Sequence, residues 1–198
     1  MAPPSTKPQS STDKSLIDKF LPAYEFHATF QIRVDAPPAR VYQALLHADL
    51  GDHWLTRLLM TLRTGKRMQR NRAPGDLPQR LQGSGFVVLE ELPNDEIVIG
   101  VAGRFWRPDG ERCMDIKAAN FTEFSRTGYA KAAWNFLLRA EPAAATATTT
   151  TTLSTETRIQ CFGSALWKFR LYWTIVGPFS GLIRHAILRQ VKTKAESE

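Results

Sequence analysis

The residues that could carry out chemistry in this chain form no known catalytic or metal-binding pattern. The histidines and cysteines are His27, His47, His53, His185, Cys113 and Cys161. They show neither metal-ligand spacing nor a disulfide framework. The segment 177–181 reads Gly-Pro-Phe-Ser-Gly, which places its serine one position away from that of a nucleophile elbow. The sequence therefore predicts no metal, no cofactor and no covalent nucleophile.

Acid–base catalysis is harder to exclude, because it needs only one or two polar groups in an apolar pocket. The candidate side chains are Arg104, Asp109, Asn120, Glu123 and Tyr172. Each also has a structural interpretation, for example Asp109 as a turn residue and Tyr172 as a core aromatic. Any catalytic residue is therefore left unknown.

Large apolar side chains and two threonines are the candidates for lining a ligand cavity. They are Trp54, Phe86, Val88, Trp106, Trp134, Phe136, Thr155, Thr157, Phe169, Tyr172 and Trp173. Apolar pockets with a few polar anchors are typical of small-molecule sites, and the threonine hydroxyls could be such anchors. An ordinary core would use the same residue types.

Basic residues are concentrated in one segment of a chain whose net charge is +7. They are Arg57, Arg63, Lys66, Arg67, Arg70, Arg72 and Arg80. Residues 65–79 lack apolar periodicity and contain Gly65, Pro74, Gly75 and Pro78, which favours a long exposed loop. This loop (57–80) could contact phosphates of an anionic membrane, or it could be a solvated surface. Nucleic acid ranks lower as a partner because no aromatic residues alternate with these charges.

The elements that must position these residues begin with a strand over residues 24–35, where apolar and polar side chains alternate. Asp35 is expected to cap a helix that has Pro37 and Pro38 in its first turn, and Asp52 a second short helix. Further strands are predicted at 86–91, 96–102, 118–125, 129–140 and 146–162. In the last of these, Leu153 and Ile159 should face the core, which puts Glu156 and Arg158 on the outer face.

The chain is expected to end in an amphipathic helix over residues 164–194, about 45 Å long. Pro178 and Gly177 predict a kink or break within it. The apolar stretch 171–183 lies between Arg170 and Arg184 and is too short to span a bilayer. With ordinary globular composition, we expect a single domain over residues 20–198, a flexible tail over 1–19, a cytoplasmic location and no stable membrane insertion.

Two segments of the sequence suggest a family. Residues 32–45 read Ile-Arg-Val-Asp-Ala-Pro-Pro-Ala-Arg-Val-Tyr-Gln-Ala-Leu, and residues 153–159 read Leu-Ser-Thr-Glu-Thr-Arg-Ile. The latter are followed by Phe-Arg-Leu-Tyr-Trp at 169–173 and Ser-Gly-Leu-Ile-Arg at 180–184. Together with the order of elements, they resemble the START/birch-pollen-allergen superfamily (SRPBCC, helix-grip fold), in its polyketide-cyclase-like bacterial branch. The resemblance covers roughly residues 20 to 195, and neither segment is a catalytic motif.

The resemblance implies an α+β fold in which a curved antiparallel sheet of about six to seven strands wraps around the C-terminal helix. It also implies a cavity between them for a hydrophobic or amphipathic molecule such as a lipid, sterol or polyketide. Two alternatives remain: a cofactor-independent cyclase or dehydratase, and a protein that binds an anionic membrane or another polyanion through residues 57–80. Fold alone does not decide among them.

Overall fold

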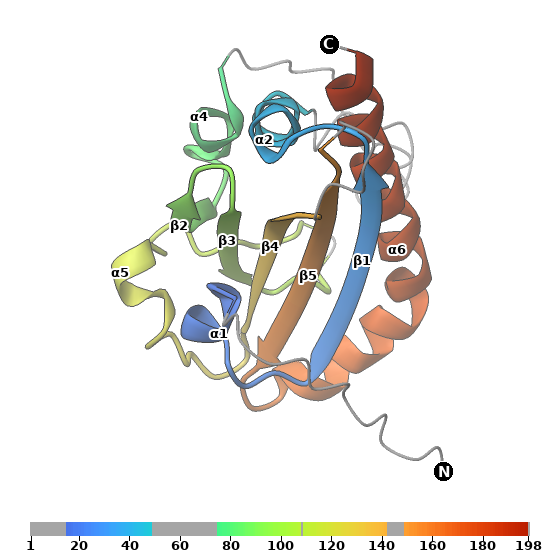
Figure 1. The fold of residues 1–198 in the computed structure, drawn as a ribbon. Helices are drawn as coiled ribbons and strands as arrows, with labels where there is room; N and C mark the ends of the chain where they lie inside the picture. Colours follow the sequence, from blue (N-terminus) through green and yellow to red (C-terminus); the bar gives the residue numbers. More distant parts are fainter. Residues whose placement is uncertain (1–14, 49–74, 108, 142–148, 198) are drawn as a thin grey trace.

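The computed structural model describes residues 15–48, 75–107, 109–141 and 149–197, apart from the side chains of residues 178–180. Its architecture is α+β: a curved antiparallel sheet lies against the C-terminal helix α6 (Ala165–Ser197), as Figure 1 shows. Short helices follow the first strand. The fold class predicted from the sequence is therefore confirmed.

The sheet has five strands in the described part of the chain, fewer than the six to seven expected. Its order is β1 (Phe26–Val34), β5 (Thr151–Cys161), β4 (Ala130–Ala140), β3 (Glu96–Gly103) and β2 (Phe86–Leu92), all antiparallel. The predicted strand at 118–125 is wrong, because this segment contains the short helix α5 (Ala118–Phe121). The Asn120 side chain accepts a hydrogen bond from the Lys117 N–H, which favours a helical turn over an extended chain.

Alternation along the strands determines which face lies against α6. In β1 the apolar side chains are more buried at every second position, as predicted. In β5 both Leu153 and Ile159 are buried and belong to the apolar core, which confirms the predicted inward face.

Helix α6 contacts mainly β1 and α2 (Pro38–Leu46). It continues through residues 177 and 178, so of the predicted kink or break the break is wrong, and Figure 1 shows the helix curving along the sheet. The residues on either side of that point are anchored, since Phe169 and Leu188 are fully buried. Anchoring at both ends holds the helix together despite the hydrogen bond that proline cannot make. Within the described residues, no helix is long and apolar enough to cross a membrane.

Helix α2 starts later than the sequence indicated, and helix α4 (Leu77–Leu81) was not predicted. The N-cap of α2 is Pro37 rather than Asp35, whose N–H instead donates to Glu196 Oε1 at 2.8 Å. Helix α4 begins inside the predicted loop, where the Asp76 side chain caps it. The helix expected after Asp52 lies outside the described residues.

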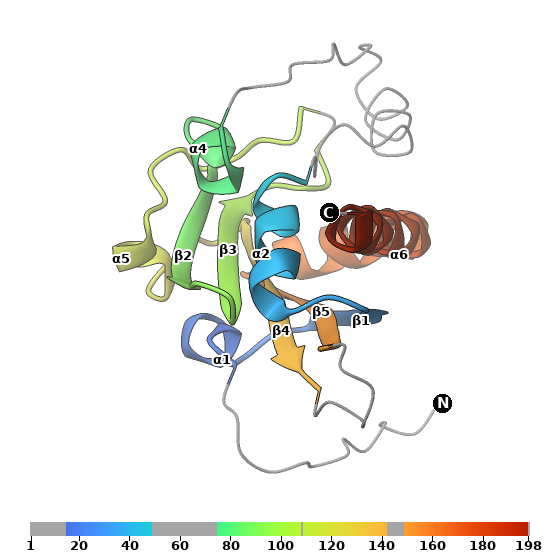
Figure 2. The ribbon, with the colours of Figure 1, turned by 45° about the horizontal axis from the view of Figure 1, so that its top comes forward.

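The outer face of the sheet is covered by α1 (Ile17–Phe20) and α5, as Figure 2 shows, while α6 lies on the other side. Residues 15–19, expected in the flexible tail, therefore belong to the packed domain, because Ile17 and Phe20 are buried against the sheet. Arg158 lies on the outer face as predicted, but it is buried. Its guanidinium pairs with Asp18 at 2.7 Å and Glu156 at 2.6 Å, which offsets the cost of desolvation.

Candidate ligand-binding site

The region between the sheet and α6 is called the inner space below. Aromatic side chains pack together and close it at one end. Phe169, which is 1% exposed, makes ring contacts with Phe26 (4.8 Å between centroids), Trp173 (5.6 Å) and Trp106 (6.4 Å). Ile159 of β5 belongs to the same cluster. Three predicted lining residues, Trp106, Phe169 and Trp173, thus pack on one another at this end.

The opposite end is closed by aliphatic packing. Leu188, Val191 and Ala195 of α6 are fully buried, in one core cluster with Leu153 of β5 and Val34 of β1. The two clusters bracket the middle of the inner space.

The middle is less completely packed than its two ends. Trp134 points inward from β4, the central strand, yet it keeps accessible surface, as do Phe30, Phe86 and Ile183 around it. On the other face of β4, the neighbouring Ala133 and Asn135 are 0% and 2% exposed. The side of the sheet toward α6 is therefore the more accessible one at its centre, although it faces a 33-residue helix.

Two polar side chains of β5 face this middle region without a hydrogen-bond partner. The hydroxyls of Thr155 and Thr157 are buried, and neither bonds to any described residue. Both threonines lie on the inward face between Leu153 and Ile159, so they lie between the two packed ends. Thr155 pairs across the sheet with Phe30, and Thr157 with Trp134.

A third unpartnered group comes from α6. Arg184 Nε is buried without a hydrogen bond, and no described carboxylate pairs with this guanidinium. Arg184 lies one turn before Leu188, so it shares the helix side that faces the core. Burial lowers the pKa of Arg184 to about 10, which leaves the group charged at neutral pH.

Contacts of the neighbouring turn place this part of α6 over Phe30. The His185 ring lies 5.1 Å from the Phe30 ring, and a Cβ added at Gly181 would come within 3.2 Å of Phe30 Cζ. Since Phe30 is the strand partner of Thr155, Arg184 and the two threonines approach the same middle region from opposite sides.

The described members of the predicted lining set lie on the inner face, but not all in the same part of it. Phe86, Val88, Trp134, Phe136, Thr155 and Thr157 are on strands, and Phe169, Tyr172 and Trp173 are on α6. Trp54 lies outside the described residues. The sequence reasoning missed Phe30 and Arg184. The spacing of Arg184 to Leu188 and Val191 was the available signal, because it puts a charge on the apolar stripe.

The predicted basic patch can be followed only at Arg80, since its other members lie outside the described residues. The Arg80 guanidinium donates to the carbonyl oxygens of Leu46 and Ala48 at 2.7 and 2.8 Å. Arg80 therefore ties α4 to the end of α2. Whether the rest of the patch meets a polyanion stays a prediction.

Three of the acid–base candidates make structural ion pairs or hydrogen bonds. Arg104 lies 3.6 Å from Glu111, and Asp109 pairs with Arg107 at 3.1 Å on the surface. Asn120 caps α5. Among the residues that the structure describes, no group of three His, Cys, Asp or Glu could hold a metal ion.

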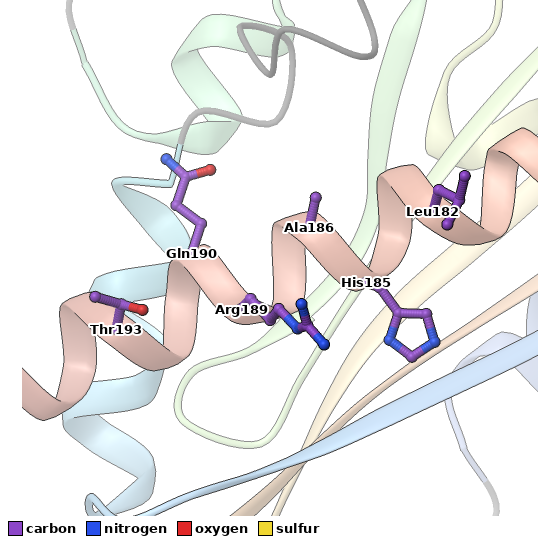
Figure 3. A pocket seen from close by; sticks show the side chains of 6 residues that line it. All are labelled: Leu182, His185, Ala186, Arg189, Gln190 and Thr193. Atoms are coloured by element: carbon purple, nitrogen blue, oxygen red, sulfur yellow. The ribbon is translucent and has the colours of Figure 1, made fainter.

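A separate pocket of about 640 Å³ lies along α6 itself. Its described wall consists of Leu182, His185, Ala186, Arg189, Gln190 and Thr193. Figure 3 shows Leu182, Ala186 and Gln190 projecting away from β1, with His185 and Arg189 on the β1 side. Leu182 and Ala186 lie on the side of α6 opposite to Arg184 and Leu188, so this pocket is distinct from the inner space.

Comparison with known proteins names no family for this chain. No family model and no curated protein matches it. Among solved structures, it is similar to an uncharacterised protein from Rhizobium leguminosarum, with 16% identity and a TM-score of 0.31. The match covers 87% of this chain and 97% of that one. A TM-score this low carries no argument about function.

Replacing Thr155 with valine is expected to stabilise the ligand-free protein by about 1 kcal/mol, because the change removes a buried hydroxyl that has no partner. The matched control is Thr151→Val on the same face of β5. There the hydroxyl donates to the Ala36 carbonyl at 2.7 Å, so its loss should destabilise by about 1 kcal/mol. Urea unfolding of both variants measures the difference. Destabilisation of equal size in both would show that Thr155 has a partner after all.

Proposed function

We propose that this protein binds a hydrophobic or amphipathic small molecule between the sheet and α6, as a START-like (SRPBCC) domain of the cytoplasm. The observation that carries the proposal is the middle of the inner face, where partly accessible aromatic side chains lie beside two unpartnered threonine hydroxyls and face the unpartnered Nε of Arg184 on α6. Small-molecule sites combine these features: apolar walls and a few polar groups that fix orientation.

A core that binds nothing explains the same region less well. Buried polar atoms in folded proteins nearly always have hydrogen-bond partners, because each orphan costs about 1–3 kcal/mol. Here three orphans lie between two well-packed clusters. A ligand with a polar end would supply the missing partners and cover the accessible rings.

Binding is a better proposal than catalysis of cyclisation or dehydration. A general acid or base works best with a pKa near the operating pH. The buried polar groups of the middle region that lack a partner are two hydroxyls and a guanidinium whose pKa is about 10. These groups can hold and orient a ligand, whereas none of them exchanges protons readily at neutral pH.

The proposal is tested by titration with the neutral dye N-phenyl-1-naphthylamine, whose emission rises in apolar surroundings. We expect saturable binding by the wild-type protein. Thr157→Phe fills the space between β5 and α6 and should weaken the affinity about tenfold or more, equivalent to about 1.4 kcal/mol. Ala28→Phe, from the strand partner of Thr157, should have the same effect.

The matched control is Thr174→Phe, which adds the same ring at an exposed position of α6 and should leave dye affinity unchanged. Circular dichroism identifies any variant that fails to fold. Absence of dye binding by the wild type, or equal affinity in the filled and control variants, would contradict the proposed site.

A further inference from the structure

The guanidinium of Arg184, whose Nε is buried without a partner, limits which ligands can fill the proposed site. A charged group removed from water requires a partner of opposite charge, and Arg184 has none among the described residues. The hydroxyls of Thr155 and Thr157, on the strand across from this part of α6, also lack partners. All three groups can donate hydrogen bonds, so together they form a site for an acceptor that carries negative charge.

We propose that Arg184 binds the carboxylate of an amphipathic acid, whose apolar part lies along Trp134, Phe30 and Phe86. This assignment rests on the proposed function and specifies its ligand class. A carboxylate matches the planar guanidinium and accepts up to four hydrogen bonds. The Thr155 and Thr157 hydroxyls donate to the same end of the ligand.

Charge balance favours a carboxylate over a phosphate monoester. At neutral pH a carboxylate carries one negative charge, which one guanidinium neutralises. A phosphate monoester carries between one and two, as a phosphorylated side chain does. The excess would stay buried among apolar side chains without a counter-charge from the described residues. The site therefore favours a ligand that has a single negative charge and an apolar tail.

Three probes that share a twelve-carbon chain test this assignment: dodecanoate, dodecanol and dodecyl phosphate. Each is measured by displacement of N-phenyl-1-naphthylamine, below its critical micelle concentration. Dodecanoate should bind the wild type at least tenfold more tightly than either of the others. Arg184→Met, an apolar replacement of similar length, should weaken dodecanoate about 100-fold, in the range measured for loss of one partner of a buried charge pair.

Two further variants separate the charge from the packing. Arg184→Lys keeps the charge but lacks the planar fork, so it should restore part of the dodecanoate affinity. Arg189→Met removes an exposed arginine of the same helix and should leave all three affinities unchanged. Dodecanol should bind Arg184→Met as well as it binds the wild type, which shows that the variant is folded and its apolar site intact.

The assignment is overturned if dodecanoate and dodecanol bind the wild type equally, or if Arg184→Met weakens both to the same extent. Either result leaves the proposed function standing when the dye still binds. If neither the dye nor any probe binds the wild type, the proposed function fails and the assignment with it.

Discussion

In the absence of ligand, the variant Arg184→Met is expected to be more stable than the wild type by about 3 kcal/mol. Burial lowers the pKa of Arg184 from its ordinary value to about 10. At pH 7 this arginine is protonated in both the folded and the unfolded protein, so the full cost of burying the charge is present. That cost falls only as the pH rises above about 10 toward the ordinary pKa of arginine. Methionine fills similar space without a charge.

Thermal unfolding at pH 7 measures this gain. For a chain of this size, about 3 kcal/mol corresponds to a rise in Tm of about 6–12 °C. The control is Arg189→Met, at an exposed position on α6, for which a change within about 0.5 kcal/mol is expected. If Arg184→Met is instead destabilised by several kcal/mol, the guanidinium has a structural partner and the cost of its burial is already offset.

Phe169→Ala is expected to destabilise the protein by about 3–5 kcal/mol. Phe169 is 1% exposed and makes ring contacts with β1, with the segment after β3 and with its own helix. Removing the ring leaves a cavity where α6 is anchored to the sheet. The surrounding rings cannot all collapse into it, because they come from three separate segments.

Urea unfolding with a constant m-value gives the size of this effect. Trp167→Ala is the control on the same turn of α6, since Trp167 is 61% exposed and its loss should matter little. A loss below about 1 kcal/mol for Phe169→Ala would mean that this end of α6 is not anchored by the aromatic cluster.

The elements with strong periodicity could be predicted from the sequence. Apolar alternation placed β1 and the inward face of β5, and the three- and four-residue spacing of apolar residues placed α6. Each of these patterns extends over a whole strand or helix. The tertiary contacts of that element favour the same secondary structure as the pattern. The inner-face positions of Trp134, Thr155 and Thr157 followed directly from this alternation.

The features that sequence reasoning missed depend on contacts distant in the chain or on short signals. Helix α5 has four residues, and a single Asn120 cap decides against a strand. Burial of Arg158 depends on Asp18, which is 140 positions earlier in the numbering, and on the carbonyl of Leu21. The continuity of α6 at Pro178 depends on anchoring at both ends. None of these can be read from a local pattern.

Arg184, Thr155 and Thr157 have one property in common. In the free protein each has a buried polar atom that contributes no hydrogen bond to a described residue. Residues that weaken the free fold in this way are expected at sites that bind something, where stability is exchanged for function. The same three side chains therefore connect the stability predictions above to the ligand assignment.

Nuclear Overhauser effects between the ring protons of bound N-phenyl-1-naphthylamine and the protein's side chains test the site most directly. We predict contacts to the γ-methyl groups of Thr155 and Thr157 and to the Trp134 indole, on the inner face. Contacts confined to Leu182 and Ala186, in the pocket on the opposite side of α6, would contradict the account.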